Sequence, residues 1–178
     1  RTEPCSGSDE AAKAALRSGM PGHVGQRGEI HAEEVHGGGE GARKDRDGCP
    51  AVRAHMSNVM NTPAEIIEAF YPIRVEKQAL RRSSGGSGLH RGGDGQIRCY
   101  RIIAPVMSMT SMVDRCVVPP FGLQGGRPGK PFRIRLKKAN GRSEAVGGKT
   151  HLRIHTDDRV VIETSGGGGY GTSASTEK

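Results

Sequence analysis

The sequence has no tryptophan, and phenylalanine and tyrosine together make up only 3% of its 178 residues. Aromatic side chains supply the stacking platforms on which single-stranded nucleic acids bind, so their scarcity argues against a base-stacking module. The hydrophobic share of 33% is also below the usual share of a globular domain. We therefore expect a small core with an irregular arm, and not one large core over the whole length.

Cysteine is scarce, and its spacing does not fit a metal site. None of the four cysteines forms a C-x-x-C pair or lies at finger spacing from a histidine pair, which argues against a zinc ribbon. Four are too few for a disulfide scaffold of this length, so we expect free thiols in a reducing cytosol. His151 and His155 lie four apart on an expected strand, where ligands on one face would be two apart, so no metal site is predicted.

Long apolar stretches are missing as well. No run of about 18 apolar residues and no signal-peptide pattern occurs, so the sequence predicts a cytoplasmic protein without a membrane span.

Positive charge and glycine are abundant. Residues 61–178 carry 19 basic against 10 acidic side chains, whereas residues 1–60 carry eight against nine. Such a surface meets an acidic partner or subunit, or it binds phosphate or nucleic acid. The arginines alternate along expected strands and form no solid block, which favours the first interpretation. A non-catalytic basic RNA-binding or scaffold module stays as the alternative.

The pattern along the chain divides it into an arm at 1–46, a domain at 47–172 and a tail at 173–178. The arm lacks any apolar period and is expected to be disordered or irregular, with structure beginning near Cys49. The domain is expected to be mainly β with a short helix (α+β), as an antiparallel sheet or sandwich. Residues that alternate between apolar and polar predict strands at 73–80, 96–103, 106–118, 132–137, 150–154 and 159–164.

The expected helix has Pro63 in its first turn and ends before Pro72. Asn61 or Thr62 could cap its first turn. Its buried stripe is expected to consist of the apolar residues Ile66, Ile67 and Phe70.

The segment before this helix collects groups that could carry chemistry. The candidates are His55, Asn58, Asn61 and Thr62. A helix start offers free N–H groups and a partial positive charge, which suit a carboxylate, a phosphate or an oxyanion. Taken alone, the spacing favours the simpler interpretation that the polar residues cap the helix.

Other segments offer weaker signals for anion binding. Arg82, Gly85 and Gly86 open a glycine-rich loop that resembles an anion nest, although glycines in turns between strands explain it equally simply. Lys149 follows two glycines but lacks the first glycine of a phosphate loop and lies on an expected strand. Asp114 and Arg115 precede a Pro-Pro bend, where they either fix the bend or face a site.

Four sequence blocks, taken in their order, resemble the C-terminal part of the hydantoinase B/oxoprolinase family. They are HMSNVMNTPAEIIEAFYP at 55–72, LRRSSGGSGLHRGGDG at 80–95, DRCVVPPFGLQGGRPG at 114–129, and the pair GGKT at 147–150 with ETSGGGGYG at 163–171. The resemblance covers about residues 47–171.

This resemblance implies a hydrolase of cyclic amides such as 5-oxoproline or a hydantoin, a reaction that links it to glutathione metabolism. It implies that a hydantoinase A-like subunit binds the ATP, that any divalent metal lies outside this chain, and that the assembly is a hetero-oligomer. It also implies that the chain is a fragment that is inactive alone. Related acetone and acetophenone carboxylases share the B-like half and are the alternative within the family. By the resemblance, the four candidates at 55–62 lie near the site, and a second group contacts substrate: Arg82, Gly85, Gly86, Asp114, Arg115 and Lys149.

Overall fold

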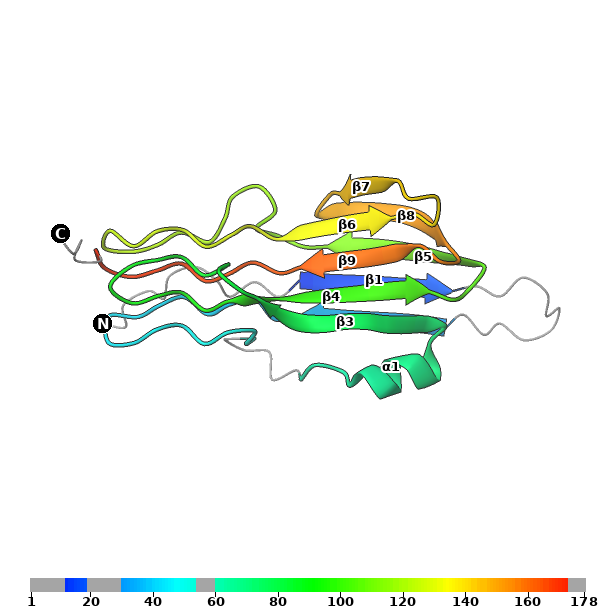
Figure 1. The fold of residues 1–178 in the computed structure, drawn as a ribbon, viewed down its shortest axis with the longest axis horizontal. Helices are drawn as coiled ribbons and strands as arrows, with labels where there is room; N and C mark the ends of the chain where they lie inside the picture. The colour runs from blue at the N-terminus through cyan, green and yellow to red at the C-terminus, as the bar shows by residue number, and fades with distance from the viewer. Residues whose placement is uncertain (1–11, 19–29, 54–59, 173–178) are drawn as a thin grey trace.

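The computed structural model describes residues 12–18, 30–53 and 60–172, whose strands form two antiparallel sheets (Figure 1). In chain order the elements are β1 (Ala12–Ser18), β2 (Ile30–His36), α1 (Ala64–Phe70), β3 (Ile73–Arg81), β4 (Gly95–Ile102), β5 (Val106–Met112), β6 (Arg133–Lys137), β7 (Ser143–Val146), β8 (Lys149–His155) and β9 (Arg159–Glu163). One sheet has the strand order β2-β1-β5-β8 and the other β3-β4-β9-β6-β7. The predicted class, mainly β with a short helix, is confirmed.

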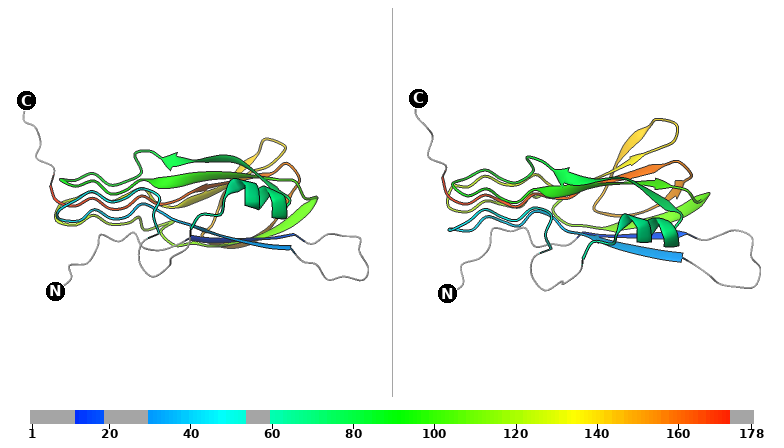
Figure 2. Two further views of the ribbon diagram at one scale, coloured as in Figure 1. Left: turned by 90° about the horizontal axis from the view of Figure 1, so that it is seen from below. Right: turned by 60° about the horizontal axis from the view of Figure 1, so that its bottom comes forward.

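The core lies between the two sheets, which Figure 2 shows as stacked layers. Alternate residues of each strand point into this space because successive side chains of a strand face opposite sides. The fully buried members include Tyr100, Ile102, Met107, Met109, Ile134, Leu136, Ile154, Val160 and Ile162. The prediction that Phe132, Ile134 and Leu136 face inward from one strand is thus confirmed.

Two strands, β1 and β2, lie in the stretch at 1–46 that was expected to be disordered or irregular, so that expectation is wrong for residues 12–18 and 30–36. From residue 73 onward the strands follow the sequence pattern with two differences. The run expected at 106–118 ends as a strand at Met112, because Arg115 adopts a φ of 59° and turns the chain. The strand β7 was not predicted, since its four residues are all exposed or half-buried at a sheet edge and carry no apolar alternation. The turn at Asn140-Gly141 connects β6 to β7, with Gly141 at a φ of 86°.

The helix α1 starts where predicted, but its predicted cap and buried stripe are wrong. Pro63 occupies the N-cap position, and no side chain caps the helix. Only Ile67 is buried, whereas Ile66 is 46% exposed and Phe70 is 67% exposed. A helix of seven residues makes about two turns, so few of its positions can face the neighbouring β3.

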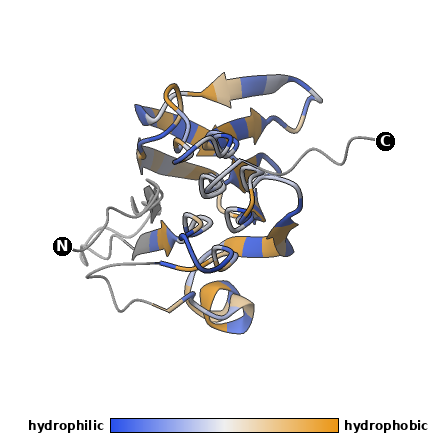
Figure 3. Cartoon of the chain, turned by 90° about the vertical axis from the view of Figure 1, so that its left-hand side faces the viewer, coloured by the Kyte–Doolittle hydropathy of each residue, from blue (hydrophilic) through white to orange (hydrophobic). Residues whose placement is uncertain are grey.

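Glycine-rich segments extend from one end of the sheets and lie side by side there (Figures 1 and 2). We call residues 37–49, 84–95, 119–130 and 164–171 the glycine bundle. Backbone hydrogen bonds of 2.8–2.9 Å join its segments, for example from Gly86 N to Gly167 O, from Gly167 N to Gly93 O and from Gly93 N to Glu40 O. Viewed from that end, the pale segments of neutral hydropathy gather at the centre of the molecule (Figure 3).

The segments of the bundle approach too closely for any side chain. A Cβ added to Gly39 would lie 1.8 Å from Gly93 O, and one added to Gly167 would lie 1.9 Å from Glu40 O. The glycine run at 166–171 is therefore a tight backbone crossing.

Residues 37–48 adopt a defined structure, although the sequence predicted that structure begins only near Cys49. Gly39 N donates to Ser165 O and Glu40 N donates to Cys49 O, both at 2.9 Å, so this segment belongs to the bundle. It needs no apolar period because backbone hydrogen bonds, and not buried side chains, hold it. Among the described residues, no helix is long and apolar enough to cross a membrane.

Candidate functional site

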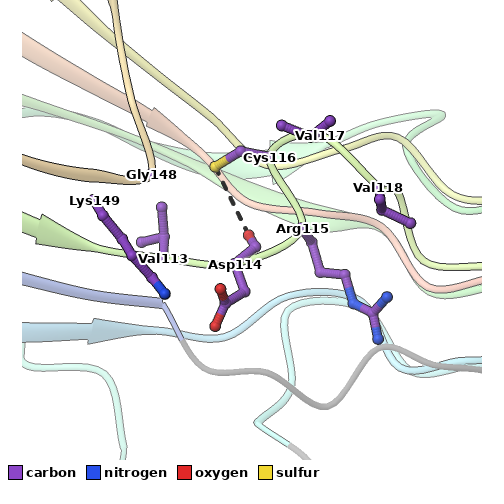
Figure 4. A pocket seen from close by; sticks show the side chains of 8 residues that line it. All are labelled: Val113, Asp114, Arg115, Cys116, Val117, Val118, Gly148 and Lys149. Carbon is purple, nitrogen blue, oxygen red and sulfur yellow. Dashed lines mark hydrogen bonds between the residues drawn. The ribbon is translucent and has the colours of Figure 1, made fainter.

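An open cavity of about 510 Å³ at the end of β5 brings together three residues that were predicted to contact substrate. Its lining consists of Val113, Asp114, Arg115, Cys116, Val117, Val118, Gly148 and Lys149. Figure 4 shows the carboxylate of Asp114 and the ammonium of Lys149 directed into the same space, with Arg115 beyond Asp114. The charged ends of Asp114 and Lys149 thus face the same part of the cavity, while the Arg115 side chain extends away from both.

Pairing between β5 and β8 explains why these residues meet although they are far apart in the sequence. Met112 pairs with Lys149 at the ends of the two strands, and Val113 N donates to Gly148 O at 2.8 Å. A Cβ on Gly148 would lie 2.5 Å from Val113 O, so this close approach requires glycine. The positive φ of Arg115 then turns the chain across the mouth of the cavity.

The chemistry of the cavity suits a small polar ring. The carboxylate of Asp114 can accept a hydrogen bond from an amide N–H, while Arg115 and Lys149 can donate to a carbonyl or carboxylate oxygen. Burial and the nearby charge of Asp114 raise the pKa of the Cys116 thiol, so it is protonated at neutral pH and is a poor nucleophile. Its sulfur lies 3.8 Å from the backbone oxygen of Asp114.

The other predicted substrate contacts, Arg82, Gly85 and Gly86, do not line this cavity. Gly86 N donates to Gly167 O at 2.8 Å within the glycine bundle, and Arg82 is exposed. Their role in substrate binding stays a prediction.

The anion nest suggested by the sequence exists, but a carboxylate of the chain itself fills it. The backbone N–H groups of Ser83, Ser84 and Gly85 all donate to the Asp94 carboxylate, at 3.2, 2.8 and 2.9 Å. Burial acts to raise the pKa of Asp94, but these three bonds and the charge of Arg91 outweigh it and lower the pKa. The nest therefore stabilises the loop in this structure.

The four candidates before the helix are only partly described. His55 and Asn58 lie outside the described residues. Asn61 is exposed, and the side chain of Thr62 lies close enough to Glu34 to act toward lowering the pKa of that carboxyl. The structure thus connects the segment before α1 to the interior through Thr62.

Glu34 belongs to a buried polar cluster that sequence reasoning missed. Arg98 donates from Nη1 to Glu34 Oε2 at 3.1 Å and to the Tyr100 hydroxyl at 3.0 Å. The ring of His36 lies 6.1 Å from that of Tyr100, and all four side chains are almost fully buried. Burial raises the pKa of Tyr100 to about 12, so its hydroxyl keeps its proton.

Burial dominates the electrostatics of this cluster. It raises the pKa of Glu34, while the side chain of Thr62 and the charge of Arg98 oppose the shift. It also lowers the pKa of His36 to about 3, with further contributions from the positive charges of Arg98 and Arg53. The imidazole is therefore neutral at physiological pH.

The alternation of residues along β4 could have indicated the cluster, but it does not show which face of the strand is buried. Alternation places Arg98, Tyr100 and Ile102 on one face, and Ile97, Cys99 and Ile103 on the other. Both faces have apolar residues, so the pattern does not tell which one is buried. The structure buries the face that carries the arginine.

Two further features bear on cofactors. Among residues 34–53 and 60–172, no group of three or more His, Cys, Asp or Glu side chains is arranged to hold a metal ion. The GGKT sequence forms the turn and first residues of β8, and Gly147 O accepts hydrogen bonds from the Ser111 and Thr150 hydroxyls. The GGKT segment therefore lacks the loop-to-helix geometry that binds nucleotide phosphates.

Comparison with known proteins identifies relatives over nearly the whole chain. The model of the hydantoinase B/oxoprolinase family matches residues 6–173. 5-Oxoprolinase 1 of Arabidopsis thaliana is 37% identical over 140 residues, which cover 79% of this chain and 11% of that protein. The chain thus spans about a tenth of the length of this relative, and the match reaches further upstream than residue 47.

Two solved structures share the fold. The ATP-dependent caprolactamase from Pseudomonas jessenii superposes with a TM-score of 0.73 at 24% identity, over 94% of this chain and 30% of that one. A nucleotide-free acetone carboxylase superposes with a TM-score of 0.70 at 17% identity, over 94% of this chain and 26% of that one.

Proposed function

Because the chain belongs to the hydantoinase B/oxoprolinase family, we propose that it takes part in the ATP-dependent hydrolysis of a cyclic amide, 5-oxoproline or a hydantoin. A hydantoinase A-like partner supplies the ATP-binding site, and the two act as a hetero-oligomer. The observation that carries the proposal is the cavity lined by Asp114, Arg115 and Lys149 within a chain of this family.

The cavity residues are assigned to the ring of the substrate. Asp114 accepts the N–H of the cyclic amide, and Lys149 with Arg115 donates to oxygen atoms of the substrate. This division of roles follows from the charges that line the cavity.

The ATP is assigned to the partner because this chain offers no phosphate loop. Lys149 begins a strand, and the nest at Ser83–Gly85 is filled by Asp94. The chain alone is therefore expected to hydrolyse neither ATP nor the amide.

The test is an assay of phosphate release with 5-oxoproline and a purified A-like partner, with and without this chain. We expect substrate-dependent phosphate release coupled to glutamate formation only when both are present. Lys149→Met should lower the coupled rate about 10-fold or more, the loss expected for one hydrogen bond with a charged group. The control Lys44→Met, at an exposed position outside the cavity, should leave the rate unchanged.

Two outcomes would contradict the proposal. Equal rates with and without the folded chain would exclude a part in ring opening. Turnover of acetone and bicarbonate, with no turnover of 5-oxoproline or hydantoin, would instead assign the chain to a carboxylase.

A further inference from the structure

The buried polar cluster contains more hydrogen-bond donors than acceptors. Within the described residues, Nε and Nη2 of Arg98, Nε and Nη1 of Arg53, and both ring nitrogens of His36 are buried without a partner. Because the neutral His36 ring has one donor and one acceptor nitrogen, the unpaired donors are the four arginine nitrogens and one ring nitrogen. Unsatisfied buried donors are costly, and those of charged groups more so. Such a set in one place indicates an acceptor that the described chain does not itself provide.

The geometry brings these groups to one place. A Cβ on Gly37 would lie 2.9 Å from Cγ of Arg53, so the Arg53 side chain lies against the backbone of the residue that follows His36. Gln96 Nε2 donates to Gly37 O at 3.0 Å and ties this backbone to β4, which also carries Arg98. Both arginine charges act on His36.

The free edge of Arg98 has a defined shape. Its Nη1 is held by Glu34 and Tyr100, which fixes the plane of the guanidinium. The remaining Nε and Nη2 point the same way and form the two-pronged edge that binds both oxygens of a carboxylate.

The charge of the cluster selects the class of ligand. Arg53 and Arg98 contribute two positive charges, and salt-bridged Glu34 contributes one negative charge, while His36 and Tyr100 are neutral. The remaining charge of +1 matches a single carboxylate. The two negative charges of a phosphate dianion would exceed the remaining charge of +1, and Glu34 would repel them.

We propose that the Arg98 edge, with Arg53 and His36, binds the carboxylate of an amino-acid-derived cyclic amide such as 5-oxoproline. This inference rests on the proposed function, because the proposed function supplies the cyclic amide as the class of substrate. It makes Arg53, which is only partly buried, the residue past which the carboxylate enters.

The first test compares 5-oxoproline with 2-pyrrolidinone, the same ring without the carboxylate, in the complex of the chain with its A-like partner. Arg53→Gln should raise the KM for 5-oxoproline about 10- to 100-fold, the loss of one charge-assisted contact, and leave kcat/KM for 2-pyrrolidinone unchanged. Arg98→Lys keeps the charge but removes the two-pronged edge, and should act in the same direction. The control Arg74→Gln, on the exposed face of β3, should change neither substrate.

The second test does not depend on turnover. The ring resonances of His36, assigned by their loss in His36→Gln, should shift on addition of 5-oxoproline but not of 2-pyrrolidinone or inorganic phosphate. Arg53→Gln should weaken that shift. This pattern without turnover would retain the carboxylate site and reject the proposed function.

Other results would overturn the inference. One such result is that Arg53→Gln changes the kinetics of 5-oxoproline and of 2-pyrrolidinone equally. Another is that it changes neither in an active complex. Absence of any His36 shift with 5-oxoproline or acetate would do the same, and would assign the donors to a carboxylate side chain of another protein segment.

Discussion

Removal of the Asp94 carboxylate tests whether the filled anion nest stabilises the fold. One oxygen, Oδ1, accepts from Ser84 N, Gly85 N and Arg91 Nη2, and the other accepts from Ser83 N. The side chain is only 17% exposed, so water replaces these bonds poorly. Asp94→Asn keeps one oxygen but turns an amide donor toward the N–H of Ser83.

The expected magnitude follows from these contacts. A hydrogen bond to a charged group contributes about 1.5–3 kcal/mol, so Asp94→Asn, which loses one bond and weakens two, should lower the free energy of unfolding by about 2 kcal/mol. Asp94→Ala removes all three backbone contacts and should cost about 4 kcal/mol. Urea unfolding at pH 7, followed by circular dichroism, measures both.

The dependence on pH gives the sharper test. The folded-state pKa of Asp94 lies below its ordinary value of 3.8, so the folded state favours the ionised form. The stabilisation is therefore fully present above about pH 4 and is lost as the pH falls through the folded-state pKa. The difference between wild type and Asp94→Asn should shrink in that window, because protonated aspartate resembles asparagine.

A matched control separates this effect from general acid sensitivity. The carboxylate of Asp157 accepts two hydrogen bonds from Arg101, at 2.6 and 2.8 Å, but is 48% exposed. Asp157→Asn should therefore change the free energy of unfolding by at most about 1 kcal/mol. The reasoning fails if Asp94→Asn is as stable as wild type at pH 7, or if its deficit is the same at pH 7 and at acid pH.

Two further predictions concern packing, both measured by urea unfolding. Gly167→Ala should destabilise the chain by about 3 kcal/mol or prevent folding, because its Cβ would overlap Glu40 O. The control Gly147→Ala should cost little, because its Cβ meets only the Thr150 hydroxyl. Similar losses of stability in the two variants would argue against the glycine bundle. Ile67→Ala should cost about 2–5 kcal/mol and exposed Phe70→Ala about 0.5 kcal/mol or less; a large loss at Phe70 would restore the helix stripe expected from the sequence.

The sheets were largely predictable because one face of each strand is buried. Alternation of Phe132, Ile134 and Leu136 with basic residues defined β6 and its inward face. The helix stripe was not predictable from period alone, since a short helix packs only where its neighbour lies. The family assignment, read from four blocks in their order, is confirmed by the family model.

The glycine segments show the limit of pattern reasoning. Residues 37–48 have no apolar period, and the same composition is typical of an irregular arm. Their order comes from backbone bonds to segments that are 40 to 130 positions away, such as Ser165. No local window of sequence contains that information.

The candidate site was predictable in its residue types but not in its grouping. Asp114 and Arg115 were identified beside a bend, and Lys149 in a glycine pair, with no reason to place them together. The register of β5 with β8 joins them in one cavity. By contrast, His55 and Asn58 lie outside the described residues, so their roles stay predictions.

The glycine bundle and the polar cluster are mechanically connected through two strands. Gly37 directly follows His36 at the end of β2, and two residues further on Gly39 N is fixed to Ser165 O at 2.9 Å. On the opposite sheet Gln96, two residues before Arg98, donates to Gly37 O. The bundle therefore sets how far His36 lies from Arg98. It follows that a bundle substitution mild enough to allow folding should disturb the environment of His36 before it disturbs the sheet core.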